Sequence, residues 1–193
     1  DLPEEYKKDY TIYNAEPLTI KAGSNKFVMT ATFDLPFQTF TDFATAPWYK
    51  ATIRTGYYIF VGDSEPYYPT STYQDADNFK WAFSGNPYEG IKIYNKSTGE
   101  AKMLGLGSAM INSAETPTAV MQDSETVWDI LKNGDGFVFQ LPGYENYYMN
   151  QNGGVNGYLG FWVNEKGRND DGSTWRVEQV DATGLEAIDT TIE

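Results

Sequence analysis

Apolar and polar residues alternate around three evenly spaced tryptophans. Each tryptophan is followed two positions later by another apolar residue, which is the spacing of a β-strand with one buried face. The interval from Trp81 to Trp128 is 47 residues, and the interval from Trp128 to Trp175 is also 47 residues. The apolar residues two positions on are Phe83, Ile130 and Val177. The alternation therefore predicts three half-buried strands that recur at a constant period.

Two further strands recur ahead of each tryptophan. The first is an opening strand marked by two apolar residues, at Ala51-x-Ile53, Ile91-x-Ile93 and Phe137-x-Phe139. The second strand follows it, at residues 57–59, 102–104 and 147–149. A unit of roughly 40 to 50 residues that contains only strands and occurs three times is typical of a closed threefold architecture. We therefore predict an all-β protein in which residues 48–181 form a β-trefoil of three repeats of about 47 residues.

The N-terminal piece of about 35 residues has no counterpart later in the chain, and we expect either a small sheet packed on the trefoil or the connection from an upstream domain. Alternating segments at residues 10–13, 18–21 and 27–33 predict strands, and the turn-forming sequence Gly23-Ser24-Asn25 between the last two predicts a hairpin. Residues 35–47 mix proline, threonine and aromatic residues without a clear period, and we expect a linker that docks its aromatic side chains. The predicted organisation is an N-terminal β appendage and linker over residues 1–47, the trefoil, and a tail or linker over residues 182–193.

Composition and charge restrict the chemistry. The chain has no cysteine and no histidine, which excludes thiol nucleophiles, disulfides, the usual zinc sites and Ser-His-Asp triads. The formal net charge of −13 repels phosphate groups, so neither nucleic acid nor a lipid surface is an expected partner, whereas neutral glycans remain compatible. No apolar run approaches the roughly 20 residues needed to cross a bilayer, so membrane insertion is not expected.

Two segments resemble a known class of module. Residues 81–96 resemble the trefoil-like accessory modules of large secreted or surface proteins of gut Bacteroidetes, and residues 172–178 are similar to the end of the same modules. More distantly, the arrangement is similar to ricin-type β-trefoil lectins, whose repeats each close on a tryptophan-containing strand. The resemblance covers residues 48–180, and it implies a trefoil in a protein tied to glycan breakdown.

One feature of the ricin-type repeat is missing from this chain. In those lectins glutamine commonly stands two positions before the repeat tryptophan, and an aspartate in the first hairpin binds sugar hydroxyls. The positions before the three tryptophans hold Phe79, Thr126 and Ser173 here. The resemblance therefore implies a fold, and it implies no sugar-binding residue.

Trp162 has no counterpart in the other two repeats. The equal spacing of the other three tryptophans predicts that they are core residues. Trp162, in contrast, lies just before a loop rich in asparagine and aspartate. Sugars are bound by an aromatic ring against the apolar face of the pyranose, with amides and carboxylates on the hydroxyls. The predicted ligand-binding residues are Trp162, Tyr158, Asn150, Asn152, Asp170 and Asp171. The alternative is that Trp162 caps the barrel.

Other groupings of polar residues are less specific. Asn169, Asp170 and Asp171 could offer oxygen atoms to calcium, but they lack the spaced pattern of a calcium loop, and a solvated turn is the simpler interpretation. No pair of carboxylates is singled out for glycoside hydrolysis. Tyr67, Tyr68 and Tyr73 form either a contact surface for glycan or protein, or ordinary loop packing. No catalytic residue, metal or cofactor is predicted.

These observations favour a noncatalytic carbohydrate-binding or adhesion module of a secreted or cell-surface, glycan-related protein, with a glycan as its partner. The competing interpretation is a protein-interaction or structural spacer domain that docks on a neighbouring domain of a larger protein. An enzyme is the third choice, because only carboxylates, lysine and tyrosine are available for chemistry.

Overall fold

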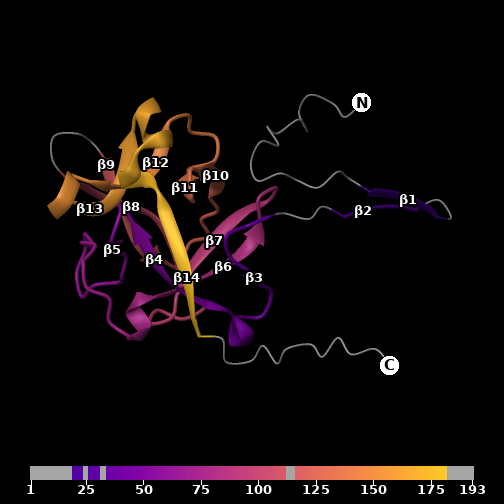
Figure 1. Ribbon diagram of the computed structural model, residues 1–193, viewed down its shortest axis with the longest axis horizontal. Coiled ribbons are helices and arrows are strands. Elements are labelled where there is room, and N and C mark those ends of the chain that lie inside the picture. The colour runs from indigo at the N-terminus through magenta and orange to yellow at the C-terminus, as the bar shows by residue number, and fades with distance from the viewer. Residues whose placement is uncertain (1–18, 24–25, 31–33, 112–115, 182–193) are drawn as a thin grey trace.

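The computed structural model describes residues 19–23, 26–30, 34–111 and 116–181, and within these ranges the regular structure consists of β-strands and short 3₁₀ helices (Figure 1). None of the described helices is long and apolar enough to span a membrane. The strands are β1 (Thr19–Gly23), β2 (Lys26–Thr30), β3 (Thr39–Phe40), β4 (Trp48–Ile53), β5 (Tyr57–Tyr58), β6 (Lys80–Asn86), β7 (Gly90–Asn95), β8 (Met103–Ile111), β9 (Thr116–Gln122), β10 (Asp129–Asn133), β11 (Gly136–Gln140), β12 (Tyr147–Asn152), β13 (Tyr158–Val163) and β14 (Trp175–Asp181). The 3₁₀ helices are η2 (Phe43–Thr45), η3 (Asp77–Phe79), η4 (Gly154–Asn156), η5 (Glu165–Asn169) and η6 (Asp171–Ser173).

Strands β3 to β14 belong to one sheet of 12 strands. Its first long strand, β4, pairs antiparallel with its last strand, β14, although more than 100 residues separate them. Figure 1 shows β14 running through the middle of the molecule beside β4. This pairing brings the beginning and the end of the sheet together, as a closed all-β architecture requires.

The three evenly spaced tryptophans occupy corresponding places in this sheet. Each one pairs antiparallel with a residue of an earlier strand, which is β4, β7 or β11. The pairs are Trp81 with Tyr49, Trp128 with Ile91, and Trp175 with Phe137. All three tryptophan side chains are fully buried, as the sequence predicts.

The register corrects the sequence alignment of the opening strands. Ala51 pairs with Val177, just as Ile93 pairs with Phe83 and Phe139 pairs with Ile130. Ala51 therefore corresponds to Ile93 and Phe139. The segment that matches Ile91-x-Ile93 and Phe137-x-Phe139 is Tyr49-x-Ala51, so the prediction that Ala51-x-Ile53 matches them is wrong by two residues. The error arises because a shift of two residues leaves every side chain on the same face of a strand. Ile53, at the next inward position, is also fully buried, so the apolar pattern fits both registers.

The predicted second strands supply hydrogen-bond acceptors for two of the tryptophans. The indole Nε1–H of Trp81 donates to the backbone oxygen of Ile59, and that of Trp128 donates to the backbone oxygen of Leu104, both at 2.9 Å. The buried Nε1–H of Trp175 has no hydrogen-bond partner within the described residues. The three tryptophans thus share a place in the sheet but differ in their polar contacts.

The main core combines aromatic and aliphatic side chains, and its aromatic rings come from strands that are far apart in the chain. The ring of Trp175 meets the rings of Trp81 and Phe139 edge to face, at centroid distances of 6.2 and 5.2 Å. The ring of Trp128 stacks on Phe161 at 5.5 Å. Edge-to-face and offset stacked pairs contribute about 0.5–1.5 kcal/mol beyond the area that they bury. The core therefore joins strands that are distant in the chain.

The predicted hairpin and the docking of aromatic side chains before β4 are confirmed where the structure describes them, whereas the N-terminal appendage stays a prediction. Strands β1 and β2 pair antiparallel in a separate two-stranded sheet, as the predicted hairpin requires, while residues 10–13 and the turn residues 24–25 lie outside the described ranges. The stretch before β4 docks aromatic side chains, because Phe37 is buried and stacks on Phe83 at a centroid distance of 4.0 Å. The domain boundaries at residues 47 and 181 stay predictions.

Candidate functional site

Four of the six residues predicted to bind a ligand lie on one face of the β12–β13 hairpin. Directly paired residues of antiparallel strands point to the same side of the sheet. Asn152 pairs with Tyr158, Asn150 pairs with Gly160, and Tyr148 pairs with Trp162. The inward positions of β13 hold Leu159 and Phe161, both fully buried. Trp162 therefore points away from the core.

Burial divides these four residues into two groups. Tyr158 and Asn150 are only 5% and 4% exposed, so little of either side chain is accessible to a ligand. Trp162 and Asn152 are partly exposed. The amide of Asn152 donates to the hydroxyl oxygen of Tyr158 at 3.0 Å, which shows that the structure brings these two predicted residues together. Trp162 and Asn152 remain the members of this face that a ligand can reach.

The Asn/Asp-rich loop folds into η5 and η6, and Asp170 stabilises the start of η6. Its Oδ1 accepts a hydrogen bond from the backbone N–H of Gly172 at 2.7 Å, which is the usual role of an aspartate at a helix N-terminus. The same oxygen accepts from the amide of Asn150 at 3.2 Å, and that amide also donates to Ser173 Oγ at 2.8 Å. Asp170 and Asn150 thus hold the loop against β12.

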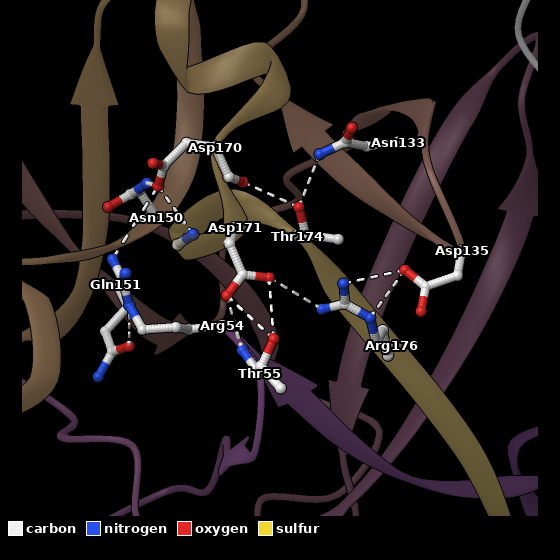
Figure 2. A network of polar contacts seen from close by, with 11 residues as sticks. Arg54, Thr55, Asn133, Asp135, Asn150, Gln151, Asp170, Asp171, Thr174 and Arg176 are labelled. Atoms are coloured by element: carbon white, nitrogen blue, oxygen red, sulfur yellow. Dashed lines mark hydrogen bonds and ion pairs between the residues drawn. The ribbon is translucent and has the colours of Figure 1, made fainter.

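Asp171 connects the loop to the β4–β5 turn and to the last strand of the sheet, β14. Its carboxylate accepts hydrogen bonds from the backbone N–H of Thr55 at 2.9 Å and from Nη1 of Arg176 at 3.2 Å. Arg176 in turn donates through Nε to Asp135 at 3.0 Å. Figure 2 shows Asp171 between Thr55 and Arg176, with Asp135 on the far side of the guanidinium. The network joins the β4–β5 turn, the β10–β11 turn and β14.

Both carboxylates of this network are held in the ionised form. Burial by itself would raise the pKa of Asp171, but the hydrogen bonds from Thr55 and Arg176 outweigh it and place that pKa below its ordinary value. The hydrogen bond from Arg176 likewise lowers the pKa of Asp135. Because the carboxylate oxygens of Asp171 and Asp135 already accept hydrogen bonds from N–H groups, they are better suited to holding the loop and strands together than to binding a cation. Within the described residues, no group of three potential metal ligands occurs.

The tyrosine-rich loop contributes one exposed ring beside the predicted site. Tyr67 is buried in the main core, and the ring of Tyr73 packs on Tyr58 and Phe79. Tyr68, in contrast, is 53% exposed, and its ring meets Tyr158 edge to face at a centroid distance of 6.5 Å. Tyr67 and Tyr73 are therefore packing residues, whereas Tyr68 is exposed enough to belong to a contact surface. No local sequence signal links Tyr68 to Tyr158, because they are 90 residues apart.

Asp171→Asn is expected to weaken folding at neutral pH and to reduce its acid sensitivity. The folded pKa of Asp171 is depressed, so its stabilising contribution is present above the unfolded pKa of about 3.9 and is lost as the pH falls through the folded value. Since the side chain is 42% exposed, solvent screening limits the expected loss at pH 7 to about 1 kcal/mol. Urea denaturation at pH 7 and at pH 3 measures the change in the free energy of unfolding.

Glu125→Gln is the matched control for this variant, because Glu125 forms an ion pair with Lys92 and is 63% exposed. We expect this control to change the stability little at either pH. The difference between wild type and Asp171→Asn should shrink at pH 3. A difference that stays constant from pH 7 to pH 3 would contradict the assignment of the carboxylate as the stabilising group.

Comparison with known proteins identifies the fold and not a sequence family. No protein-family model matches the chain, and no curated protein matches it. Among solved structures, a ricin B-like lectin of Macrolepiota procera, in complex with lactose, has a TM-score of 0.57 and 17% identity over 72% of this chain and 100% of that chain. The Rhizoctonia solani agglutinin has a TM-score of 0.54 and 16% identity over 70% of this chain and 96% of that chain. A mosquitocidal holotoxin has a TM-score of 0.55 and 16% identity over 71% of this chain but only 18% of that chain.

These similarities, together with the sheet described above, show that the protein has an all-β, β-trefoil-like fold. They support the predicted distant similarity to ricin-type lectins. The resemblance to accessory modules of gut Bacteroidetes stays a prediction.

Proposed function

We propose that this protein is a noncatalytic carbohydrate-binding module. The observation that carries the proposal is its β-trefoil-like fold, which matches the whole of a ricin B-like lectin solved with lactose. The chemistry of the chain is compatible with this role, since it lacks cysteine and histidine and its net charge of −13 does not disfavour neutral glycans. A hydrolytic role is less favoured, because the Asp170 and Asp171 carboxylates already accept hydrogen bonds within the protein.

The proposal includes an internal repeat. The 47-residue spacing of the tryptophans and their corresponding pairings with β4, β7 and β11 support three repeats of about 47 residues around a pseudo-threefold axis. Residues 1–47 are proposed as an N-terminal appendage of this trefoil. We further propose that the module acts outside the cytoplasm, as part of a secreted or cell-surface protein that handles glycans.

The proposed binding surface lies on the outer face of the β12–β13 hairpin. Trp162 offers a partly exposed indole ring, and Asn152 lies on the same face four residue pairs farther along the hairpin. An aromatic ring and neighbouring amides are the groups that proteins use to bind sugars. The other predicted residues are proposed to support this face. Asn150 bonds to Asp170, Asp170 caps η6, the Tyr158 hydroxyl accepts from Asn152, and Asp171 accepts from Thr55 of the β4–β5 turn.

Trp162→Ala is expected to weaken glycan binding by about fivefold or more, because it removes the stacking platform. A glycan array identifies the ligand, and isothermal titration with that glycan then measures the affinity of each variant. Thermal denaturation checks that Trp162→Ala remains folded. Tyr144→Ala, which removes a ring that is 60% exposed at the turn before β12, is the control and is expected to bind normally. Unchanged affinity of Trp162→Ala would exclude this surface, and an array with no bound glycan would exclude the function.

The competing interpretation is a spacer domain that docks on a neighbouring domain, and one observation favours it. A second hydrophobic cluster, of the buried residues Ala46, Trp48 and Ala82, lies apart from the main core, and the side chains of Phe40 and Phe43 at its edge are only partly buried. In the mosquitocidal holotoxin, the matched region is a small part of a much longer chain. An array without any bound glycan would favour this alternative.

A further inference from the structure

A small cleft lies on the outer face of the β4–β14 pair, away from the β12–β13 hairpin. Its volume is about 150 Å³, and it is lined by Lys50, Thr52, Tyr58, Arg176, Val177 and Glu178. Lys50 lies opposite Glu178 across the two strands, and Thr52 lies opposite Arg176. Tyr58, on β5, pairs with Thr52 from the other side. The strand register therefore places the side chains of Lys50, Thr52, Tyr58, Arg176 and Glu178 together on one face, whereas Val177 packs against the main core.

The two cations of the cleft are fixed in place by carboxylates. Lys50 Nζ lies 2.8 Å from Glu178 Oε1, and this hydrogen bond raises the pKa of Lys50. Arg176 Nη2 lies 2.9 Å from Asp135, and Nη1 lies 3.2 Å from Asp171. Two positive charges thus face three negative charges. The lining itself holds two cations and one carboxylate, but Asp135 and Asp171, which bind Arg176 from outside the lining, reverse the balance. The cleft therefore does not select an anion such as phosphate.

The same lining suits a neutral polyhydroxylated ligand. A sugar hydroxyl is both donor and acceptor, so it binds best where N–H groups and carboxylate oxygens lie side by side. Arginine has five N–H groups and lysine has three, so the ion pairs described above leave further donors on Arg176 and Lys50. Tyr58 adds a partly exposed ring, which packs on the ring of Tyr73 at a centroid distance of 5.4 Å. The cleft thus offers an aromatic ring together with hydrogen-bond donors and acceptors, which are the groups that proteins use to bind sugars.

The corresponding positions of the other two strand pairs are filled differently. On β6 and β7, the places of Arg176 and Thr52 are taken by Ala82 and Tyr94, which are buried beside Phe40 and Phe43. On β10 and β11, the places of Glu178 and Lys50 are taken by Leu131 and Val138. The trefoil-like fold therefore does not require charged pairs at these positions. A lysine at the place of Lys50 recurs on β7 as Lys92, which pairs with Glu125, so it is the combination of Lys50, Glu178 and Arg176 that distinguishes the β4–β14 pair.

We propose that the β4–β14 cleft is a second carbohydrate site, which takes one neutral pyranose unit against Tyr58 and binds its hydroxyls through Lys50, Arg176 and Glu178. This inference rests on the proposed carbohydrate-binding function and assigns it an additional site. The cleft volume is below the roughly 300–1,000 Å³ of sites for drug-sized ligands, so it accommodates one sugar unit and not an extended chain.

Chemical-shift titration of the full isotope-labelled chain tests the site directly. The probes are the methyl glycosides of galactose, glucose, mannose and fucose, together with N-acetylglucosamine, with glucuronate and inorganic phosphate as charged comparisons. At least one neutral sugar is expected to shift the backbone amides of residues 50, 52, 58, 176 and 178 and the side-chain Nε–H of Arg176 in a saturable manner. The two charged probes are expected to shift them less.

Two variants and two matched controls complete the experiment. Tyr58→Ala and Glu178→Ala are each expected to weaken binding at the cleft by about fivefold or more. Glu178 is 73% exposed, so its variant should fold even if Tyr58→Ala does not. Tyr88→Ala and Glu125→Ala remove an exposed tyrosine and the carboxylate of another surface ion pair, and they are expected to bind like wild type.

The possible outcomes separate this inference from the function on which it rests. Shifts confined to the neighbourhood of Trp162 would refute the cleft and retain the carbohydrate-binding function. A response to glucuronate or phosphate alone would refute a neutral ligand at the cleft. An absence of saturable shifts with every sugar, together with an array on which no glycan binds, would refute both.

Discussion

Replacement of Trp81, Trp128 or Trp175 by alanine is expected to lower the free energy of unfolding by about 3–5 kcal/mol in each case. All three side chains are fully buried, and each indole packs among aromatic residues from other strands. Alanine would leave a cavity that the closely packed core cannot easily collapse to fill, since each tryptophan side chain is fully buried in the main core. The loss is a large part of the roughly 5–15 kcal/mol by which a typical domain is stable.

Urea denaturation followed by intrinsic fluorescence and circular dichroism measures the effect. Val163→Ala, at a position that is 50% exposed, is the control and is expected to change the stability by less than about 0.5 kcal/mol. Losses of about 3–5 kcal/mol at all three tryptophans would agree with their corresponding places in the sheet, with the smallest loss at Trp175, whose N–H has no partner among the described residues. A variant that loses less than about 1 kcal/mol would contradict the assignment of that tryptophan to the rigid core.

Replacement of the same tryptophans by phenylalanine is expected to lower the free energy of unfolding less at Trp175 than at Trp81 and Trp128. Phenylalanine keeps an aromatic ring but removes the indole N–H. At Trp81 and Trp128 this leaves the buried backbone oxygen of Ile59 or Leu104 without its donor, which adds about 1–3 kcal/mol to the loss. At Trp175 the change removes a buried N–H that has no partner among the described residues.

Trp175→Phe should therefore be less destabilising than Trp81→Phe and Trp128→Phe by about 1–3 kcal/mol. The comparison uses the same chemical change at three corresponding positions, so the smaller volume of the ring affects all three. Equal losses in the three variants would show that the Trp175 N–H is satisfied in solution, for example by a buried water. The free energies of unfolding come from the same urea experiments.

The strands that carry the fold were predictable from the sequence. A strand with one buried face has an apolar residue at every second position, and this local pattern marks the tryptophan strands and the second strands at residues 57–59, 102–104 and 147–149. The opening strand of the first unit was placed two residues too late, at Ala51 instead of Tyr49. Alternation does not distinguish the two registers, and only pairing with β6 and β14 does so.

The candidate site was predictable only in part. The period of two in β12 and β13 places Asn150, Asn152, Tyr158 and Trp162 on one face, as the structure shows. The sequence does not show that Asn150 and Tyr158 are buried, because their burial depends on a loop and a tyrosine that pack over them. The cleft at Lys50 and Arg176 has no sequence signal at all, since its two sides lie more than 100 residues apart.

The sequence by itself determined the class of fold, the strands that recur and the three tryptophans that fill the core, because burial of one strand face imposes a period that is visible in a single chain. The tertiary structure alone decided the register of β4, the partners of Asp171 and the neighbours of Arg176. The physical reason is closure of the sheet. When β4 pairs with β14, side chains from the two ends of the chain become neighbours, and their hydrogen bonds depend on distances that no local pattern records.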